Sequence, residues 1–147
     1  MNENDSLQIS VAASIIYRKT QMWKDVHYLD SELTSAQIPV LITVCRKEGI
    51  SQNELVELLM MDKSTVAKLI GKLVESGYLL RLPNAKDKRA YDLLPSTKAM
   101  NLYPRLLENG VIWENTLTKG MSADEVKILK RLLTLATQNA TEYSKEI

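Results

Sequence analysis

Signals that start or stop helices recur at such short intervals between residues 34 and 77 that only short helices fit there. A capping residue followed three positions later by Glu or Gln marks a helix start, and glycine marks a helix end. The start signals are Thr34 with Gln37, Ser51 with Glu54, and Asp62, and the end signals are Gly49 and Gly77. The sequence therefore predicts three short helices on tight turns, and the last two have the spacing of a helix-turn-helix.

After Gly77 the pattern changes from helical to strand-like. The segments YLLRL and AYDLL favour strands, and the polar, turn-forming stretch PNAKDKR separates them. This order predicts a β-hairpin with a long charged tip. A further helix is predicted from about Ser96 towards Leu117, and we expect Pro104 to kink or break it because proline removes a backbone donor.

Two longer helices are predicted at the ends of the chain. Apolar residues between Leu7 and Leu29 recur at helical spacing. Those between Val126 and Tyr143 alternate at spacings of three and four residues, which is typical of a coiled-coil seam. The predicted fold class is therefore mainly α (α+β): a winged helix-turn-helix with a two-stranded wing and a long helix on either side.

Positive charge is concentrated in the third short helix and the hairpin. The whole chain has a net charge of only +1, but the segment from Lys63 to Arg89, called the basic window below, holds seven basic and two acidic residues. Binding to nucleic acid follows a local basic patch rather than the total charge of a protein. The basic window therefore makes nucleic acid the first partner to consider.

The third short helix has polar side chains opposite its apolar face. These polar residues are Lys63, Ser64, Thr65, Lys68 and Lys72. A helix fits the major groove of duplex DNA, where hydroxyls can bond to phosphates or base edges and lysines can reach phosphates or guanine acceptors. A charged helix face is more often simply solvated, and for the helix alone that interpretation stays open.

The hairpin places more basic residues directly after this helix in sequence. They are Arg81, Lys86, Lys88 and Arg89. A basic loop can follow the DNA backbone and put an arginine into the narrow minor groove, where the negative potential is strong. Duplex DNA accounts for all seven positive charges with one ligand. The alternative is a winged-helix module that binds protein or RNA, which would not need basic and short polar residues on that helix face.

The order of these elements resembles the multiple-antibiotic-resistance-regulator (MarR) family of winged-helix repressors. The stretch LTSAQIPVL resembles the start of that family's second helix, and QNELVELLMMDKSTVAKLIGKLVESGYLLR is similar to its third helix, recognition helix and first wing strand. DKRAYDLLPSTKA resembles its signature wing, in which Asp87, Arg89 and Ala90 hold the D-x-R-A positions. The resemblance covers essentially the whole chain, and residues 51–99 are its most specific part.

The resemblance implies roles for individual residues. Arg89 is expected to reach the minor groove, and Asp87 to orient nearby basic side chains. The recognition-helix contacts are expected at Lys63, Ser64, Thr65, Lys68 and Lys72. The chain departs from the family pattern with Ala99 in place of a usual glycine, Pro95 in place of a leucine, and Met60 where a residue tolerant of positive φ is common. These departures affect local geometry and remove no DNA-contacting residue.

The terminal helices have apolar faces that the small central module cannot cover. A two-fold partner would bury them and would present two recognition helices to a palindromic operator; the alternative is that the helices pack only within their own chain. The resemblance implies the dimer, because family members dimerise through these helices. We predict one domain over residues 1–147, with the DNA-binding lobe at residues 33–95 and helical dimerisation regions at residues 1–32 and 96–147.

The resemblance also implies a small aromatic or phenolic effector that binds between the dimer helices and the DNA-binding lobe. Four aromatic residues on the flanking helices could line such a cleft: Tyr17, Trp23, Tyr103 and Trp113. Aromatic residues at helical spacing more often belong to a core, so both interpretations stay open.

Catalysis, metal binding and redox sensing are not favoured. One cysteine, one histidine and five scattered glycines supply no nucleophile–base pair, metal cluster or phosphate-binding loop. Cys45 shares a helix face with Ile38 and Leu41, so we expect a buried and unreactive thiol. The single cysteine, the polar N-terminus and the lack of a long apolar run predict a cytoplasmic protein without cofactor, metal or membrane contact.

Overall fold

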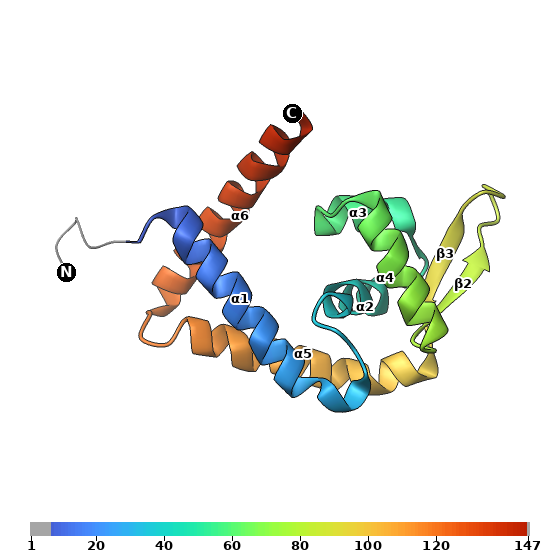
Figure 1. Ribbon diagram of the computed structural model, residues 1–147, viewed down its shortest axis with the longest axis horizontal. Coiled ribbons are helices and arrows are strands. Elements are labelled where there is room, and N and C mark those ends of the chain that lie inside the picture. The colour runs from blue at the N-terminus through green and yellow to red at the C-terminus, as the bar shows by residue number, and fades with distance from the viewer. Residues whose placement is uncertain (1–6, 147) are drawn as a thin grey trace. The chain divides into compact units, whose positions relative to one another are not determined.

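In the computed structural model, which describes residues 7–146, the chain is mostly helical with one small sheet (Figure 1). In chain order the elements are α1 (Ile9–His27), η2 (Leu29–Ser31), α2 (Gln37–Arg46), β1 (Ile50–Ser51), α3 (Gln52–Leu59), α4 (Lys63–Glu75), β2 (Leu79–Pro83), β3 (Tyr91–Pro95), α5 (Thr97–Leu117) and α6 (Ala123–Glu146). The chain divides into two compact units, and the boundary lies inside α5, between Leu106 and Leu107.

The predicted caps start α3 and α4. Ser51 Oγ accepts a hydrogen bond from the Glu54 amide at 3.2 Å, and Glu54 Oε2 accepts one from the Ser51 amide at 2.9 Å, so the capping box of α3 is complete. Asp62 Oδ1 accepts from the amide of Thr65 at 2.8 Å and caps α4. The turn between α3 and α4 passes through Met60, whose φ of 51° is left-handed, at the position where the resemblance implies a residue tolerant of positive φ. The helix-turn-helix is thus built by local signals.

The second helix begins two residues later than predicted, because Ala36 rather than Thr34 is at its N-cap position. The helix α2 begins at Gln37, and no side chain caps it; instead Gln37 Oε1 accepts from the amide of Thr34 at 2.8 Å. Pro39 therefore lies in the first turn, where helix amides have no intrahelical partner, and it costs no backbone bond. The predicted break at Pro104 does not occur either, because α5 continues from Thr97 to Leu117.

The two predicted wing strands form, and a third strand joins them. The sheet is antiparallel with the order β1-β3-β2, and Arg81 of β2 lies opposite Leu93 of β3. The two-residue strand β1 pairs on the other side of β3, with Ile50 opposite Leu93. Because β1 runs directly into α3, this pairing holds the start of α3 beside the wing.

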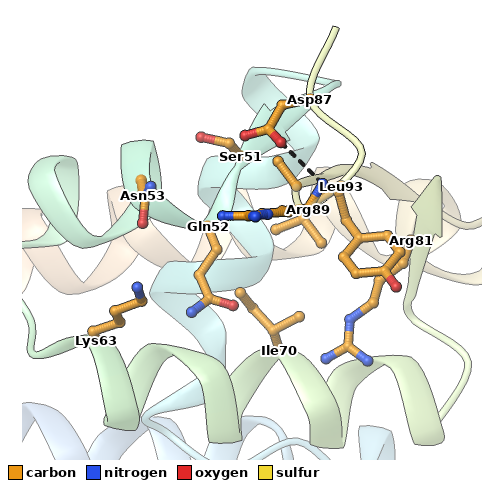
Figure 2. A pocket seen from close by; sticks show the side chains of 11 residues that line it. Ser51, Gln52, Asn53, Lys63, Ile70, Arg81, Asp87, Arg89 and Leu93 are labelled. Carbon is orange, nitrogen blue, oxygen red and sulfur yellow. Dashed lines mark hydrogen bonds between the residues drawn. The ribbon is translucent and has the colours of Figure 1, made fainter. Parts of the chain in front are cut away.

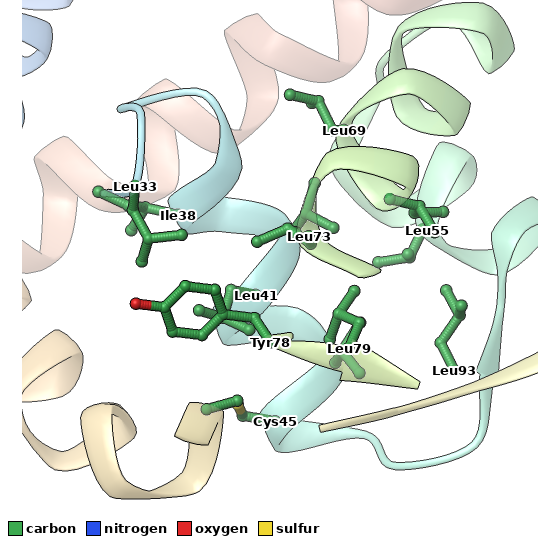
Figure 3. Packing of buried hydrophobic residues seen from close by; sticks show 14 of the residues in the cluster. Leu33, Ile38, Leu41, Cys45, Leu55, Leu69, Leu73, Tyr78, Leu79 and Leu93 are labelled. Carbon is green, nitrogen blue, oxygen red and sulfur yellow. The ribbon is translucent and has the colours of Figure 1, made fainter. Parts of the chain in front are cut away.

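The core of the first unit explains which face of α4 is available. Figure 3 shows leucines from α2, α3, α4 and both wing strands packed together. The apolar face of α4 is buried in this core through Val66, Leu69, Ile70 and Leu73. The hydroxyl of Tyr78, at the start of the wing, donates to the Ser31 carbonyl at 2.6 Å and links the wing to η2. The polar face of α4 consequently faces outward, as predicted.

The helices α1 and α6 show a different burial pattern. Neither helix buries a residue fully, although each carries large apolar side chains. In α1 the exposed ones are Ile9, Val11, Ile16, Tyr17, Met22 and Val26, and in α6 they are Ile128, Leu132, Leu133, Leu135 and Tyr143. Within residues 7–146, no helix combines the length and the apolar character that crossing a membrane requires.

Candidate nucleic-acid interface

The exposed face of α4 carries the polar residues that the sequence assigned to DNA contact. Lys63, Ser64, Lys68 and Lys72 are exposed, and Thr65 is half-buried. They are held in place because the opposite face of the helix is fixed in the core. A helix presented in this way has the geometry to enter a major groove.

A pocket of about 300 Å³ separates α4 from the wing and from the start of α3. Four predicted site residues line it: Lys63, Arg81, Asp87 and Arg89. In Figure 2 the Arg81 side chain extends from β2 towards α4, and Arg89 extends from the wing towards Gln52. A Cβ atom at Gly71 of α4 would lie 3.9 Å from Arg81 Nη2, so the guanidinium group rests over the recognition helix. We call this site the wing pocket.

Hydrogen bonds of the Asn84 and Asp87 side chains hold the backbone at the tip of the wing. Asn84 Oδ1 accepts from the amides of Lys86 and Asp87, both at 2.9 Å, and Asn84 Nδ2 donates to Asp92 Oδ1 at 2.8 Å. Asp87 Oδ1 accepts from the backbone amide of Arg89 at 2.9 Å (Figure 2). Asp87 therefore shapes the backbone that carries Arg89. The exposed Lys86 and Lys88 are presented on a hydrogen-bonded tip rather than a loose loop.

The seven cations of the basic window have no carboxylate partner in the part of the chain that the structure describes. The ion pairs there join Lys47 to Glu54, Arg105 to Asp30, and Lys130 to Glu114, all outside the window. Exposed cations without an internal partner are available to neutralise phosphates.

The hydroxyls of Ser64 and Thr65 are both engaged by the cap of their own helix. Ser64 Oγ donates to Asp62 Oδ1 at 2.6 Å, and Thr65 Oγ1 donates to Asp62 Oδ2. These bonds, together with the capping amide of Thr65, lower the pKa of Asp62 far below its usual range. Asp62 is thus a charged acceptor at the N-terminal end of the recognition helix.

The sequence alone did not identify several residues of the interface. Gln52 and Asn53 line the wing pocket, and Asn84 and Asp92 fix the wing tip. The placement of Gln52 and Asn53 depends on the pairing of β1 with β3, which joins segments about 40 residues apart. The turn-forming character of Asn84, two residues before Lys86, was a local signal for the tip.

The four aromatic residues considered for an effector site have different environments. Trp23 and Tyr103 are partly buried against the core, and the Trp23 ring stacks on His27 at 4.0 Å. Tyr17 is 64% exposed and lines a cavity of about 400 Å³ together with Lys24, whose pKa is lowered by burial. Trp113 belongs to the second unit. Within the first unit, Tyr17 is the aromatic residue of the four that faces this cavity.

Cys45 is buried, as predicted, with 6% of its surface exposed. Burial, followed by the nearby charge of Glu48, raises the pKa of its thiol to about 11. A thiol with this pKa carries almost no thiolate at neutral pH.

Comparisons with known proteins find transcriptional regulators, most of them described as MarR proteins. A family model described as the MarR family matches residues 31–90. An uncharacterized HTH-type transcriptional regulator of Bacillus subtilis, YybA, is 27% identical over 135 residues, which is 90% of each chain. The multiple antibiotic resistance protein MarR of Escherichia coli is 31% identical over 103 residues, covering 69% of this chain and 72% of that one. A crystal structure of a MarR mutant from E. coli complexed with operator DNA is 26% identical, with a TM-score of 0.78 over 87% of this chain and 92% of that one.

Proposed function

This chain belongs to the MarR family of transcriptional regulators, and from that premise we propose that it is a cytoplasmic, homodimeric repressor that binds a palindromic DNA operator. The observation that carries the proposal is the joint placement of the exposed face of α4 and the wing around the wing pocket. Lys63, Arg81 and Arg89 line this site. A duplex offers phosphates on both sides of its grooves for these cations to bind.

The proposed binding mode assigns one groove to each element. The helix α4 enters the major groove with Lys63, Lys68 and Lys72 directed at phosphates or guanine acceptors. The wing lies along the backbone. The side chain of Arg89, which points towards Gln52 in the free protein (Figure 2), rotates out of the wing pocket into the minor groove when DNA binds. Arg81, Lys86 and Lys88 neutralise phosphates between the two grooves. The operator complex of the E. coli MarR mutant supports this assignment by similarity of fold.

The proposed dimer rests on the exposed apolar faces of α1 and α6. Single exposed leucines are normal on a monomer, but each of these helices exposes at least five large apolar side chains, and such a concentration favours an interaction surface. A second copy of the chain is the proposed partner, because a two-fold dimer supplies the second recognition helix that a palindrome requires. We assign residues 1–32 and 96–147 to dimerisation, and residues 33–95 to DNA binding.

We also propose that a small aromatic or phenolic compound weakens DNA binding. The cavity beside Tyr17 and Lys24 supports this part of the proposal, since it offers an aromatic ring next to a desolvated amine. Of the four aromatic residues considered, Tyr17 is the one we retain as a ligand contact.

Capture of genomic DNA fragments by the purified protein tests the proposal. The bound fragments are sequenced and then titrated in the presence of excess unrelated duplex. We expect a small set of enriched fragments that share an inverted repeat, with affinity that falls steeply as salt rises. If no fragment is enriched over bulk DNA, or if affinity is insensitive to salt, the DNA-binding proposal is wrong and a protein-binding winged helix takes its place.

A further inference from the structure

The proposal that follows rests on the proposed function and refines how the recognition helix reads DNA. We propose that Asp62 is a positioning residue that sets specificity: it holds the hydroxyl protons of Ser64 and Thr65, so that these two side chains present only acceptor lone pairs to the major groove. The two hydroxyls then select exocyclic amino groups, which are adenine N6 and cytosine N4.

The geometry around Asp62 supports this direction of bonding. One carboxylate oxygen accepts from the Ser64 hydroxyl at 2.6 Å and from the Thr65 amide at 2.8 Å, and the other accepts from the Thr65 hydroxyl. A serine or threonine hydroxyl has one proton and two lone pairs. Once that proton is directed at Asp62, only the lone pairs remain for another partner.

The charge state of Asp62 fixes which atom donates. Hydrogen bonds from Ser64 and Thr65 lower the pKa of the Asp62 carboxyl, so it is ionised at neutral pH and has no proton to give. An ionised carboxylate only accepts hydrogen bonds. The two hydroxyls must therefore be the donors in both bonds.

This arrangement changes what the two hydroxyls can recognise. Phosphate oxygens, guanine O6 and N7, and thymine O4 are all acceptors, so a hydroxyl without a free proton has nothing to offer them. The sequence alone had left phosphates open as partners of Ser64 and Thr65, and the cap argues against that assignment. The negative charge of Asp62 also disfavours a phosphate at this point of the helix.

The position in the helix suits a base contact. Ser64 is the second residue of α4, and the residues near the start of a recognition helix are those that reach base edges. Ser64 is exposed, and Thr65 is half-buried beside it. The neighbouring Lys63 remains able to bind a phosphate or a guanine.

Selection from a random duplex library locates the contacted base pairs. The wild type is compared with Ser64→Ala and Thr65→Val, which remove one hydroxyl each and keep the Asp62 cap on the Thr65 amide. Positions at which a variant loses its base preference are the hydroxyl contacts. At those positions we expect the wild type to accept adenine or cytosine on one strand.

Removal of the amino group itself is the decisive step. In the selected operator, purine replaces the adenine, or 2-pyrimidinone replaces the cytosine, and each keeps the rest of the ring. We expect the wild type to lose roughly 3- to 10-fold in affinity, the value of one hydrogen bond. The matching hydroxyl-deletion variant should lose no affinity through the missing hydrogen bond. Because both proteins bind the same modified duplex, a change in the duplex itself affects both affinities and cancels in their ratio.

Asp62→Asn gives an independent test of the cap. Asparagine is also a good helix cap, so the fold should persist, but its NH₂ group donates where a carboxylate oxygen accepted. One hydroxyl proton is then released, and we expect preference at that position to move towards guanine or thymine. Should Asp62→Asn fail to fold by circular dichroism, the hydroxyl-deletion variants still decide the question.

Each outcome has a separate meaning. In one outcome the wild type selects a motif and yet keeps its affinity when the amino group is removed at every hydroxyl-dependent position. Alternatively, neither hydroxyl deletion changes the base preference at any position. Either result refutes the role of Asp62 and leaves DNA binding intact. If the wild type selects no motif at all, the proposed function itself fails.

Discussion

Lys68→Ala provides a quantitative test of the orientation of α4. Lys68 is exposed and lies on the polar face, opposite Val66 and Ile70, which are buried. A lysine in contact with a phosphate contributes about −0.9 to the slope of log K against log salt concentration. A two-fold dimer carries Lys68 twice, so the substitution should make the slope less steep by about 1.8.

The slope converts into a measurable ratio. Raising the salt concentration from about 50 mM to about 200 mM is about a fourfold increase. With slopes that differ by about 1.8, the ratio of wild-type affinity to variant affinity for the operator should fall about 12-fold over this range. Fluorescence anisotropy on a short operator duplex measures both affinities across this range.

Lys98→Ala is the matched control, because it removes the same charge from the same unit. Lys98 Nζ donates to the Ser76 carbonyl at 2.9 Å and lies 4.3 Å from the centre of the Tyr78 ring, so it is engaged within the protein. Its loss should leave the salt slope unchanged even if affinity falls. If Lys68 instead reads a guanine, discrimination at one operator position should relax by about 1–3 kcal/mol. A Lys68→Ala protein that keeps both the slope and the specificity of the wild type would show that this side chain faces solvent.

Three further perturbations address the wing, the thiol and the helix cap. Arg89→Ala should weaken operator binding while circular dichroism and sedimentation stay as in the wild type; unchanged affinity in a gel shift would remove the wing from the binding mode. Cys45→Ser should leave any release of DNA by peroxide unaltered. It should lower the free energy of unfolding by about 1–3 kcal/mol, since a hydroxyl is buried in an apolar site. A serine variant that stays on DNA in peroxide when the wild type is released would refute the burial argument. The pKa of Glu54 is lowered to about 2, first by its bond with Lys47 and then by the Ser51 amide, so its contribution to stability is present above its usual pKa of 4.5 and is lost as pH falls from there towards 2. Acid unfolding of Glu54→Gln should lack this component. Identical pH profiles for both proteins would count against the bonds of the ionised Glu54 carboxylate with Lys47 and the Ser51 amide.

The sequence predicted the elements whose signals are local. The Ser51–Glu54 box, the Asp62 cap and the apolar face of α4 each act within a few residues, and each is present in the structure. The start of α2 was misplaced because Thr34 and Gln37 match the box pattern, but only the glutamine side chain makes its bond. Local pattern cannot distinguish a complete box from half of one.

Features that depend on strand pairing between segments far apart in the sequence could not be predicted from local signals. The strand β1 has two residues and exists only through its pairing with β3, and that pairing carries Gln52 into the wing pocket. The second function of Asp62 was also hidden, because a cap is recognised from its backbone bond alone. The two hydroxyl bonds depend on side-chain rotamers that follow from the fold.

The stoichiometry of the complex with a selected operator tests the central claim most directly. Sedimentation at micromolar concentration gives the mass of the free protein and of its complex with a duplex chosen from a random library. We predict a dimer of the 16.6 kDa chain in both states, and an operator whose half-site centres are about 10 base pairs apart. A well-folded monomer in solution, or a selected site without an inverted repeat, would contradict the account of a two-fold DNA-binding regulator.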